Sequence, residues 1–237
     1  NNRQAKSVAV VHFYQLDRYL FLLAKSYYKN PQAKLRMIGI TGTNGKTSAS
    51  QIIAQLLNSC EQNCAVIGTV GAGLLGNLTA LNNTTPGATQ LHQLLGEFTQ
   101  NNVSHVAMEI SSHALSQHRV SPQLIDVAVF TNLSRDHLDY HKTMANYADA
   151  KFQLFSHDQA QVAVINGDDL QAKEWLSHWS SEEVVFVYGR GNAIKQFSRF
   201  VHASDIKQTN QGVSFLLNTH IYLDQTQSFL SKIYLHF

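Results

Sequence analysis

From residue 37 onward, hydrophobic residues fall into short runs that are separated by amphipathic stretches. The runs have the length of buried strands, and they lie at residues 37–41, 64–68, 105–110, 125–133, 162–166 and 184–188. Apolar residues recur at helical spacing between them, at 49–57, 91–98 and 147–155. Strands that alternate with helices are typical of βαβ units. The pattern therefore predicts an α/β fold, a mainly parallel sheet with helices on both faces.

The stretch 49–57 gives the sharpest prediction of a packed helix. Its apolar residues follow one another at the spacing that places them on one side of a helix, and they are Ala49, Ile52, Ile53, Leu56 and Leu57. We expect this face to be buried against the sheet.

Both ends of the chain depart from this alternation. Residues 1–36 carry a short helical pattern followed by a proline at position 31, and we interpret them as a linker or the remnant of a preceding domain. Residues 37–237 then form one domain. Beyond residue 198, the stretches 213–217 and 220–223 alternate like antiparallel strands, with Asn218 and Thr219 as a turn between them. We expect a small antiparallel portion there.

Composition excludes several classes of protein. The 237 residues carry a formal net charge of only +2, whereas a nucleic-acid binder usually has a clear basic excess. The apolar runs are far shorter than the roughly 20 residues that cross a bilayer. Cys60 and Cys64 are too few for a disulfide framework or a structural zinc site. We therefore expect a cytoplasmic protein with reduced thiols that binds neither nucleic acid nor membrane.

The strongest motif is a phosphate loop between the first strand and the first helix. Glycines let backbone N–H groups approach phosphate oxygens, and a helix N-terminus attracts anions. Lys46 would reach the β- and γ-phosphates of ATP, and the Thr47 hydroxyl would bind Mg²⁺. The predicted ATP contacts of this loop are Gly42, Thr43, Asn44, Gly45, Lys46, Thr47 and Ser48. A strict motif has glycine at the position of Ile40, so this loop is a variant, and a turn that binds no ligand is the alternative.

Three further segments carry a resemblance. They are Asn83-Thr84-Thr85-Pro86, the stretch 107–119, which contains Glu109, Ser111, Gln117 and Arg119, and the stretch 131–141, which contains Asp136 and His137. Together with the phosphate loop, these segments resemble the Mur ligase family, and within it the MurE type. The resemblance covers about residues 35–169, and it extends more weakly to about 217.

The resemblance implies an ATP-dependent amide-bond-forming ligase of peptidoglycan synthesis. Such an enzyme activates the D-Glu carboxylate of UDP-N-acetylmuramoyl-L-Ala-D-Glu as an acyl phosphate. The amino group of meso-diaminopimelate or lysine then attacks it. The implied partners are the UDP-N-acetylmuramoyl dipeptide and the amino acid, and we expect a monomer.

Glu109 is a candidate metal ligand on two grounds. It lies at the carboxyl end of a predicted strand, where ligand crevices open in parallel sheets, and Mg²⁺ prefers oxygen ligands. The resemblance adds His137 as a metal ligand and implies that Lys151 is carbamylated, so that it supplies an anionic oxygen. It also implies catalytic roles for Lys46, Lys151 and His137. Taken alone, Lys151 is an ordinary solvated helix lysine.

The resemblance also assigns the residues that hold the UDP-sugar-peptide, namely Asn83, Thr84, Thr85, Ser111, Gln117 and Arg119. Without it, the first three form a turn and Ser111 caps a helix. The resemblance also implies that Asn166 binds ATP, since it begins a loop that is near the nucleotide in relatives; the alternative is a helix N-terminus capped by Asp168. We assign no chemical role to the neighbouring histidines at positions 113, 118 and 141, for which surface or supporting positions suffice.

Two other functions remain open. The phosphate loop is shared with folylpolyglutamate synthases and other Mur ligases, and a truncated, non-catalytic nucleotide-binding protein is the second alternative. We expect the C-terminal domain of the ligases to be absent, together with the Asp-Asn-Pro-Arg segment that recognises the amino acid in relatives. A Gly-x-Phe-Asn-x-x-Asn stretch expected near the end of the central domain is also missing, and residues 228–233 stand near where it should begin. Without that domain water would reach the acyl phosphate. We expect this chain alone to turn over very slowly or not at all.

Overall fold

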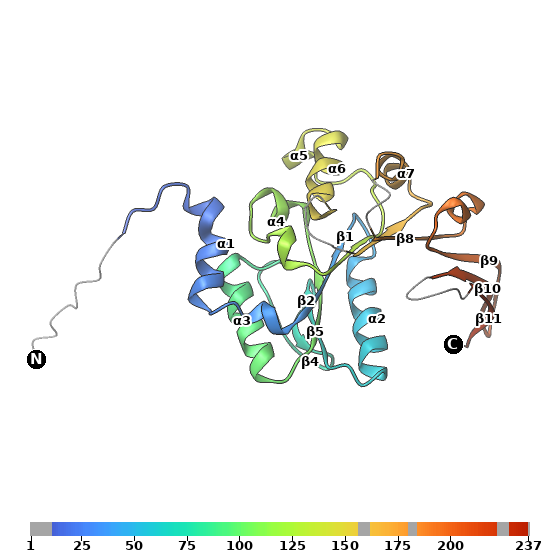
Figure 1. The fold of residues 1–237 in the computed structure, drawn as a ribbon, viewed down its shortest axis with the longest axis horizontal. Coiled ribbons are helices and arrows are strands. Elements are labelled where there is room, and N and C mark those ends of the chain that lie inside the picture. Colours follow the sequence, from blue (N-terminus) through green and yellow to red (C-terminus); the bar gives the residue numbers. More distant parts are fainter. Residues whose placement is uncertain (1–10, 156–161, 180–183, 222–227, 237) are drawn as a thin grey trace, which may run out of the picture.

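The structure is a computed structural model that describes residues 11–155, 162–179, 184–221 and 228–236. The described strands join one sheet in the order β11-β10-β9-β8-β7-β6-β1-β5-β2-β3-β4 (Figure 1). Their bounds are β1 Arg36–Thr41, β2 Cys64–Gly68, β3 Gly71–Leu74, β4 Asn77–Thr79, β5 His105–Glu109, β6 Val127–Phe130, β7 Val162–Asn166, β8 Val184–Gly189, β9 Phe200–Thr209, β10 Gly212–His220 and β11 Ser228–His236.

The helices connect these strands and cover both faces of the sheet. Their bounds are α1 Leu16–Tyr27, α2 Lys46–Ser59, α3 Ala88–Gln100, α4 Ser112–Ser116, α5 Leu138–His141, α6 Met144–Phe152 and α7 Leu170–Ser177. Short 3-10 turns are η1 Pro31–Lys34, η2 Pro122–Leu124, η3 Gln153–Phe155 and η4 Asn192–Gln196. No helix within the described ranges is long and apolar enough to cross a membrane.

The centre of the sheet is parallel, as predicted. β2, β5, β1, β6, β7, β8 and β9 follow one another in parallel pairs. The carboxyl ends of these strands therefore meet at one edge of the sheet, which is where ligand crevices form in α/β proteins. β6 is shorter than the predicted run 125–133, and the residues after it form a loop at this edge.

Antiparallel strands extend the sheet at both ends. The C-terminal portion was predicted, and β9, β10 and β11 confirm it. The predicted turn at Asn218 and Thr219 is wrong, because both lie inside β10 and pair with His202 and Val201 of β9. Leu223, the end of the second predicted strand, lies outside the described residues. The hairpin of β3 and β4 was not predicted, since its glycines weaken any apolar alternation.

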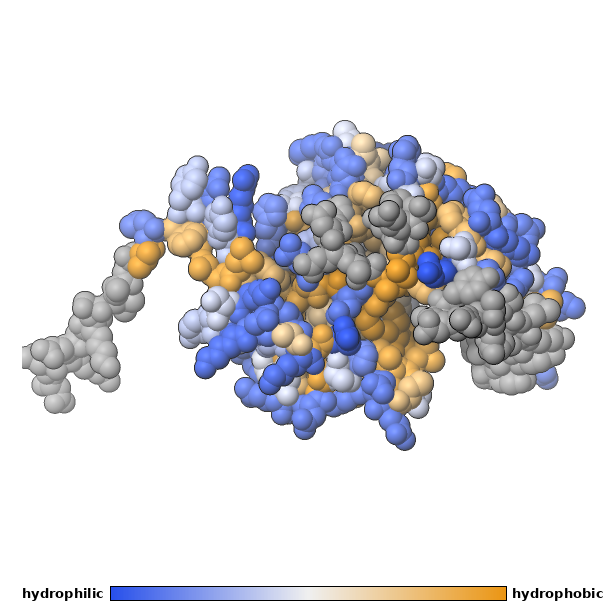
Figure 2. Space-filling view, in the orientation of Figure 1, coloured by the Kyte–Doolittle hydropathy of each residue, from blue (hydrophilic) through white to orange (hydrophobic). Residues whose placement is uncertain are grey.

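The two faces of the sheet are covered unequally. Residues of α1, α3, α6 and α7 pack in the core on one face, whereas α2 packs with Ile40 and Val66 on the other (Figure 1). The prediction for α2 is partly wrong, because Ile52 is 54% and Leu56 is 62% exposed. Ala54 is fully buried, and Ala49, Ile53 and Leu57 pack partly buried against the same core cluster, whereas Ile52 and Leu56 lie outside this contact. Figure 2 shows the resulting hydrophobic surface over α2.

The helical pattern before residue 37 is confirmed as α1. This helix packs on α3, where the Phe21 ring meets the His92 ring edge-on with centroids 4.7 Å apart. Both side chains are buried, so α1 shares the core of the sheet domain.

Candidate active site

The phosphate-loop segment lies between β1 and α2, as predicted. β1 ends at Thr41, and α2 begins at Lys46 after Gly45, whose φ of 83° lies in the left-handed region that favours glycine. Ile40 is fully buried and pairs with Glu109 of β5. The loop is shorter than a strict motif because Ile40, which holds the position of the first glycine, belongs to the core strand. The N-terminus of α2 follows the loop directly.

A second loop, which follows β6, holds the phosphate loop in place. The Asn132 carbonyl oxygen accepts a bond of 2.8 Å from the Thr43 N–H, and its side chain exchanges two 3.0 Å bonds with the backbone of Asn44. The Thr131 hydroxyl donates to the Asn44 carbonyl oxygen at 2.7 Å. A Cβ atom at Gly42 would collide with the Thr131 hydroxyl oxygen. These contacts fix the loop before any ligand binds.

Two lysine side chains end at the phosphate loop. The Lys46 Nζ atom donates to the carbonyl oxygens of Gly42 and Thr43, both at 2.9 Å. Lys151 of α6 is only 1% exposed and donates to the same Gly42 oxygen at 2.8 Å. Tyr147, one turn earlier in α6, places its ring centroid 4.5 Å from Lys151 Nζ and its hydroxyl 3.2 Å from Thr43 Oγ1. The interpretation of Lys151 as a solvated helix lysine is therefore wrong.

Burial changes the protonation of these groups. Burial, together with the smaller effect of the positive charge of Lys46, lowers the pKa of Lys151 from 10.5 to about 7, against the opposing effect of Asp136. Burial also lowers the pKa of Lys46, and the negative charges of Glu109 and Asp136 partly offset this decrease. Because the pKa of Lys151 is near 7, a large fraction of its amine is neutral at neutral pH.

Glu109 lies at the end of β5 with 1% of its surface exposed. Its Oε2 atom accepts bonds from the hydroxyls of Thr47, at 2.9 Å, and Thr69, at 3.2 Å. Its Oε1 atom accepts a bond of 2.9 Å from the Thr69 backbone N–H. A Cβ atom at Gly68 would overlap the carboxylate, so the glycine makes room for it. Thr47 and Glu109 together offer the hard oxygen donors that Mg²⁺ prefers.

His137 does not join this pair in the structure. It is the N-cap residue of α5, with a left-handed φ of 53°, and its Nε2 atom lies 3.4 Å from Asp136 Oδ2. Its ring meets the His113 ring edge-on at 4.9 Å. Over the described ranges, no group of three or more His, Cys, Asp or Glu residues could hold a metal ion. The structure brings Thr47 and Glu109 together, and it leaves His137 beside Asp136.

The flanking histidines have supporting positions. His141 is 6% exposed, and its Nε2 atom lies 2.9 Å from the Ser112 hydroxyl, which joins α5 to α4. The His113 ring packs against Tyr140 with centroids 4.3 Å apart. The expectation that these residues occupy surface or supporting positions agrees with this geometry.

The predicted substrate residues divide into exposed and internal ones. Asn83 is exposed, and the Thr84 hydroxyl lies 3.0 Å from the Thr69 hydroxyl. Thr85 is 1% exposed, donates to the Glu109 carbonyl oxygen at 2.9 Å and accepts a bond from the Ser111 N–H at 3.0 Å. Its hydroxyl is therefore used inside the protein, where it ties the segment to the end of β5.

The remaining substrate candidates flank α4. Ser111 caps this helix by accepting a bond from the Ala114 N–H at 3.1 Å. Arg119 donates to Gln117 Oε1 and, at 3.4 Å, to the Thr85 carbonyl oxygen. The structure thus gathers the predicted substrate segments at the carboxyl ends of β2 and β5, next to Glu109.

Asn166 supports the loop after β6. Its side-chain amide donates to the Thr131 carbonyl oxygen at 2.7 Å and accepts a bond from the Asp168 N–H at 3.1 Å. Asp169 caps α7, so the alternative interpretation, in which Asp168 is the cap, is wrong. Asp169 also accepts a bond from the Leu133 N–H at 2.9 Å. Asp168 instead accepts bonds from the backbone N–H groups of residues 190 and 191, so it braces the connection after β8.

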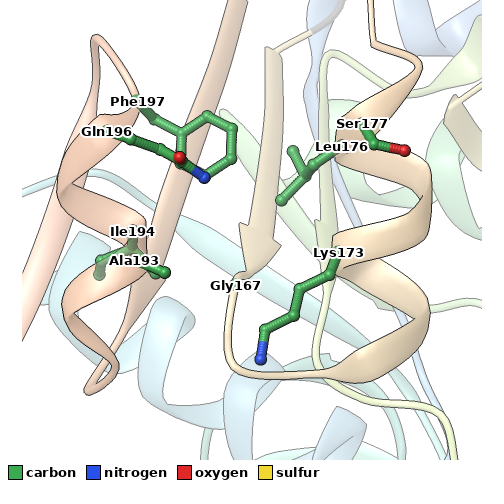
Figure 3. Close-up of a pocket in the computed structure, with 8 residues that line it drawn as sticks. All are labelled: Gly167, Lys173, Leu176, Ser177, Ala193, Ile194, Gln196 and Phe197. Carbon is green, nitrogen blue, oxygen red and sulfur yellow. The ribbon is translucent and has the colours of Figure 1, made fainter.

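A separate cavity of about 310 Å³ lies between α7 and η4. In Figure 3 the Lys173 side chain reaches along its lower side, and Leu176 faces Phe197 across it. None of the residues predicted to bind nucleotide, metal or substrate lines this cavity. The candidate site is instead the open edge formed by the phosphate loop and the loops after β2, β5 and β6.

Two residues of this site were not predicted. Tyr147 carried a signal, since it precedes Lys151 by four positions and therefore lies on the same helix face. Thr69 directly follows β2, at the edge where the other site residues gather, but an isolated threonine after a strand carries no motif.

Comparison with known proteins agrees with this arrangement. The Mur ligase middle domain matches residues 40–233. The chain belongs to the Mur ligase family. A UDP-N-acetylmuramoyl-L-alanyl-D-glutamate--2,6-diaminopimelate ligase from Haemophilus influenzae (strain 86-028NP) is 45% identical over 172 residues, which are 73% of this chain and 35% of that protein. The ligase of the same name from Coxiella burnetii (strain RSA 493 / Nine Mile phase I) is 42% identical over 212 residues, 90% of this chain and 43% of that protein.

A solved structure of a ligase with this name superimposes on the Mur ligase fold of the chain. Its TM-score is 0.72 at 34% identity, and the match covers 91% of this chain and 43% of the solved one. The chain thus spans less than half the length of these relatives. It contains the family's middle domain.

Proposed function

We propose that the chain is the ATP-binding part of a ligase that adds 2,6-diaminopimelate to UDP-N-acetylmuramoyl-L-Ala-D-Glu. The observation that carries the proposal is the contact between the phosphate loop, through Thr47, and Glu109, whose strand end also holds the segment of Thr84 and Thr85. A nucleotide and a second substrate would meet there. The names of the relatives favour diaminopimelate over lysine.

The phosphate loop would bind the nucleotide through backbone N–H groups and the N-terminus of α2. Lys46 now donates to two loop carbonyl oxygens. These bonds would be exchanged for bonds to the β- and γ-phosphates, so that the ammonium group balances the charge that develops during transfer. Asn166 would act indirectly, by supporting the loop that holds Asn44.

The residues present fit a magnesium ion at Thr47 and Glu109. Both offer oxygen atoms, and Gly68 leaves room for the buried carboxylate beside them. When bound, Mg²⁺ would polarise the transferring phosphoryl group. His137 would have to turn from Asp136 to reach this ion, and we propose it as a third protein ligand beside Thr47 and Glu109.

Lys151 fits carbamylation. The neutral amine attacks CO₂, a C–N bond forms as one C–O π bond opens, and one proton leaves to solvent, which converts the neutral amine into a carbamate with an anionic oxygen ligand. Burial supports this reaction because it lowers the pKa of Lys151 to about 7. The phosphate loop lies directly beside the amine.

The same edge would orient the muramoyl dipeptide for attack on ATP. Arg119 can pair with a carboxylate or phosphate of the ligand, and Asn83, Thr84, Ser111 and Gln117 would contact other polar groups of the ligand. The D-Glu carboxylate oxygen attacks the γ-phosphorus, and ADP leaves. The amine of the amino acid then attacks the acyl carbon, and inorganic phosphate leaves. We extend the proposal to residues 37–237 as the central domain of a monomeric cytoplasmic enzyme, with residues 1–36 as a linker or remnant of the preceding domain whose helix α1 packs on the central domain.

Calorimetric titration of the chain with the ATP analogue AMPPCP and Mg²⁺ tests the proposal. We expect Lys46→Ala to weaken binding at least about tenfold, the effect of losing roughly 1.4 kcal/mol. Lys173→Ala, which removes an exposed lysine of α7, is the matched control. Equal affinity of wild type and Lys46→Ala would overturn the assignment of the loop.

A second titration tests the substrate class. We expect UDP-N-acetylmuramoyl-L-Ala-D-Glu, and not a folate, to bind to the chain loaded with AMPPCP and Mg²⁺. Preference for the folate would instead identify a folylpolyglutamate synthase. Binding of the nucleotide with neither of these compounds would favour a nucleotide-binding protein that is not a ligase.

A further inference from the structure

We infer that Thr69 is a positioning residue that fixes the Glu109 carboxylate and connects it to Thr84. The inference rests on the proposed function, because Glu109 is there a ligand of the nucleotide's metal ion. It assigns a role to a residue outside the motifs that carry the family resemblance.

Thr69 contacts both oxygen atoms of the carboxylate. Its backbone N–H donates to Oε1 at 2.9 Å, and its hydroxyl donates to Oε2 at 3.2 Å. Two donors from one residue hold both the position and the plane of the carboxylate. The Thr47 hydroxyl, the other proposed ligand, meets the same Oε2 atom. Thr69 therefore determines which lone pairs of Glu109 face Thr47.

The proton of the Thr69 hydroxyl sets the direction of the next bond. A hydroxyl has one proton, and an ionised carboxylate only accepts. Because the Thr69 proton is directed to Glu109, the 3.0 Å bond between Thr69 and Thr84 must be donated by Thr84. Thr84 thus donates a hydrogen bond to Thr69, and Thr69 donates one to Glu109.

This direction limits what Thr84 can bind. Its single proton is already used, so its oxygen is available only as an acceptor. Thr84 would therefore receive an N–H or O–H group of the ligand, such as a peptide amide or a sugar hydroxyl. A phosphate or carboxylate oxygen at this position would have to break the bond to Thr69.

Thr69 also lies outside the core, which makes its role testable. The residue is exposed, and valine preserves both its shape and its backbone N–H bond to Oε1. Thr69→Val therefore removes one hydroxyl and leaves the fold intact. Thr79→Val is a matched control, since Thr79 is also exposed and lies in the neighbouring hairpin.

The experiment measures Mn²⁺ affinity in the presence of saturating ADP, by the electron paramagnetic resonance signal of free Mn²⁺. We expect Thr69→Val to weaken Mn²⁺ binding roughly tenfold, the loss of one hydrogen bond to a charged group. Thr69→Ser should restore wild-type affinity, and Thr79→Val should not change it. A merely structural threonine would show no such rescue by serine.

The link to Thr84 is tested by a double-mutant cycle. We expect Thr84→Val to weaken Mn²⁺ binding in the wild-type background and to have no further effect in Thr69→Val. Additive losses would overturn the link, and unchanged affinity in Thr69→Val would overturn the positioning role. Failure of the wild-type chain to bind Mn²⁺ with ADP would instead overturn the proposed function, and the inference with it.

Discussion

The Nζ atom of Lys151 donates a 2.8 Å hydrogen bond to the carbonyl oxygen of Gly42, in the phosphate loop. The same oxygen accepts a 2.9 Å bond from Lys46. Two amines thus share one acceptor in a buried region, and like charges that approach in this way disfavour double protonation. The arrangement explains why Lys151, and not an exposed lysine, fits a reaction that needs a neutral amine.

The first prediction concerns the uptake of CO₂ by Lys151. Under a fixed pressure of ¹³CO₂, we expect a carbamate signal in the ¹³C NMR spectrum that grows as the pH rises through about 7, because burial lowers the pKa of Lys151 to about 7. Lys151→Ala should lack the signal, and Lys142→Ala, at an exposed position, should keep it. A signal that survives in Lys151→Ala would show that another amine reacts.

The sequence predicts the site best where neighbours along the chain form it. The order of strand, glycine loop and helix places Gly45, Lys46 and Thr47 together, and the structure confirms this local arrangement. The contact between Lys151 and Gly42 spans 109 positions, so no local pattern encodes it. The burial of Lys151 follows from the packing of α6 against the phosphate loop, which only the fold supplies.

The wrong predictions have equally specific physical causes. Asn218 and Thr219 are polar residues of a half-exposed strand near the sheet edge, and such residues resemble a turn when the pairing partners are unknown. Ile52 and Leu56 have helical spacing, but the face of α2 that packs on the sheet consists of Ala54 with Ala49, Ile53 and Leu57, and these two residues lie outside it. Spacing indicates which residues share a face of a helix, and it does not indicate how wide the contact is.

The second prediction tests the room that Gly68 leaves for Glu109. Its φ lies outside the left-handed region, so alanine is compatible with the backbone, but the new Cβ would lie 2.6 Å from the carboxyl carbon. We expect Gly68→Ala to displace the carboxylate and to weaken Mn²⁺ binding more than about tenfold. The overpacking should also cost roughly 1–3 kcal/mol of the free energy of unfolding.

Gly96→Ala is the control for this variant. Gly96 lies in α3 with nothing within 4 Å of the added Cβ atom, so alanine should raise the free energy of unfolding by about 0.5–1 kcal/mol without changing Mn²⁺ binding. Normal Mn²⁺ affinity in Gly68→Ala would show that Glu109 is not a metal ligand.

The third prediction separates two neighbouring aspartates. Asp169 caps α7 and also holds the Leu133 N–H of the loop beside the phosphate loop. Asp168 instead accepts bonds from the backbone N–H groups of residues 190 and 191, in the connection after β8. We expect Asp169→Ala to lower both the free energy of unfolding, by about 1–2 kcal/mol, and the affinity for AMPPCP with Mg²⁺. Asp168→Ala should lower the stability alone, and equal nucleotide affinities in the two variants would contradict this division.

The last prediction concerns the pH dependence of stability. Burial lowers the pKa of Lys151 to about 7 in the folded chain, against 10.5 for an ordinary lysine. Between these values the unfolded chain holds a proton that the folded chain has lost, so stability must rise with pH. The slope is about 1.4 kcal/mol per pH unit. Lys151→Met keeps a long unbranched side chain and removes the titration.

Urea unfolding at pH 7.5, 8.5 and 9.5 in CO₂-free buffer measures this effect. The difference in the free energy of unfolding between wild type and Lys151→Met should move in favour of the wild type by roughly 2–3 kcal/mol across this range. Other titrating groups, such as Cys64, contribute equally to both proteins and cancel in the difference. Lys142→Met should follow the wild type, because its side chain is exposed. Parallel pH profiles for wild type and Lys151→Met would mean that Lys151 keeps an ordinary pKa and is protonated at neutral pH, so that it would lack the neutral amine that carbamylation requires.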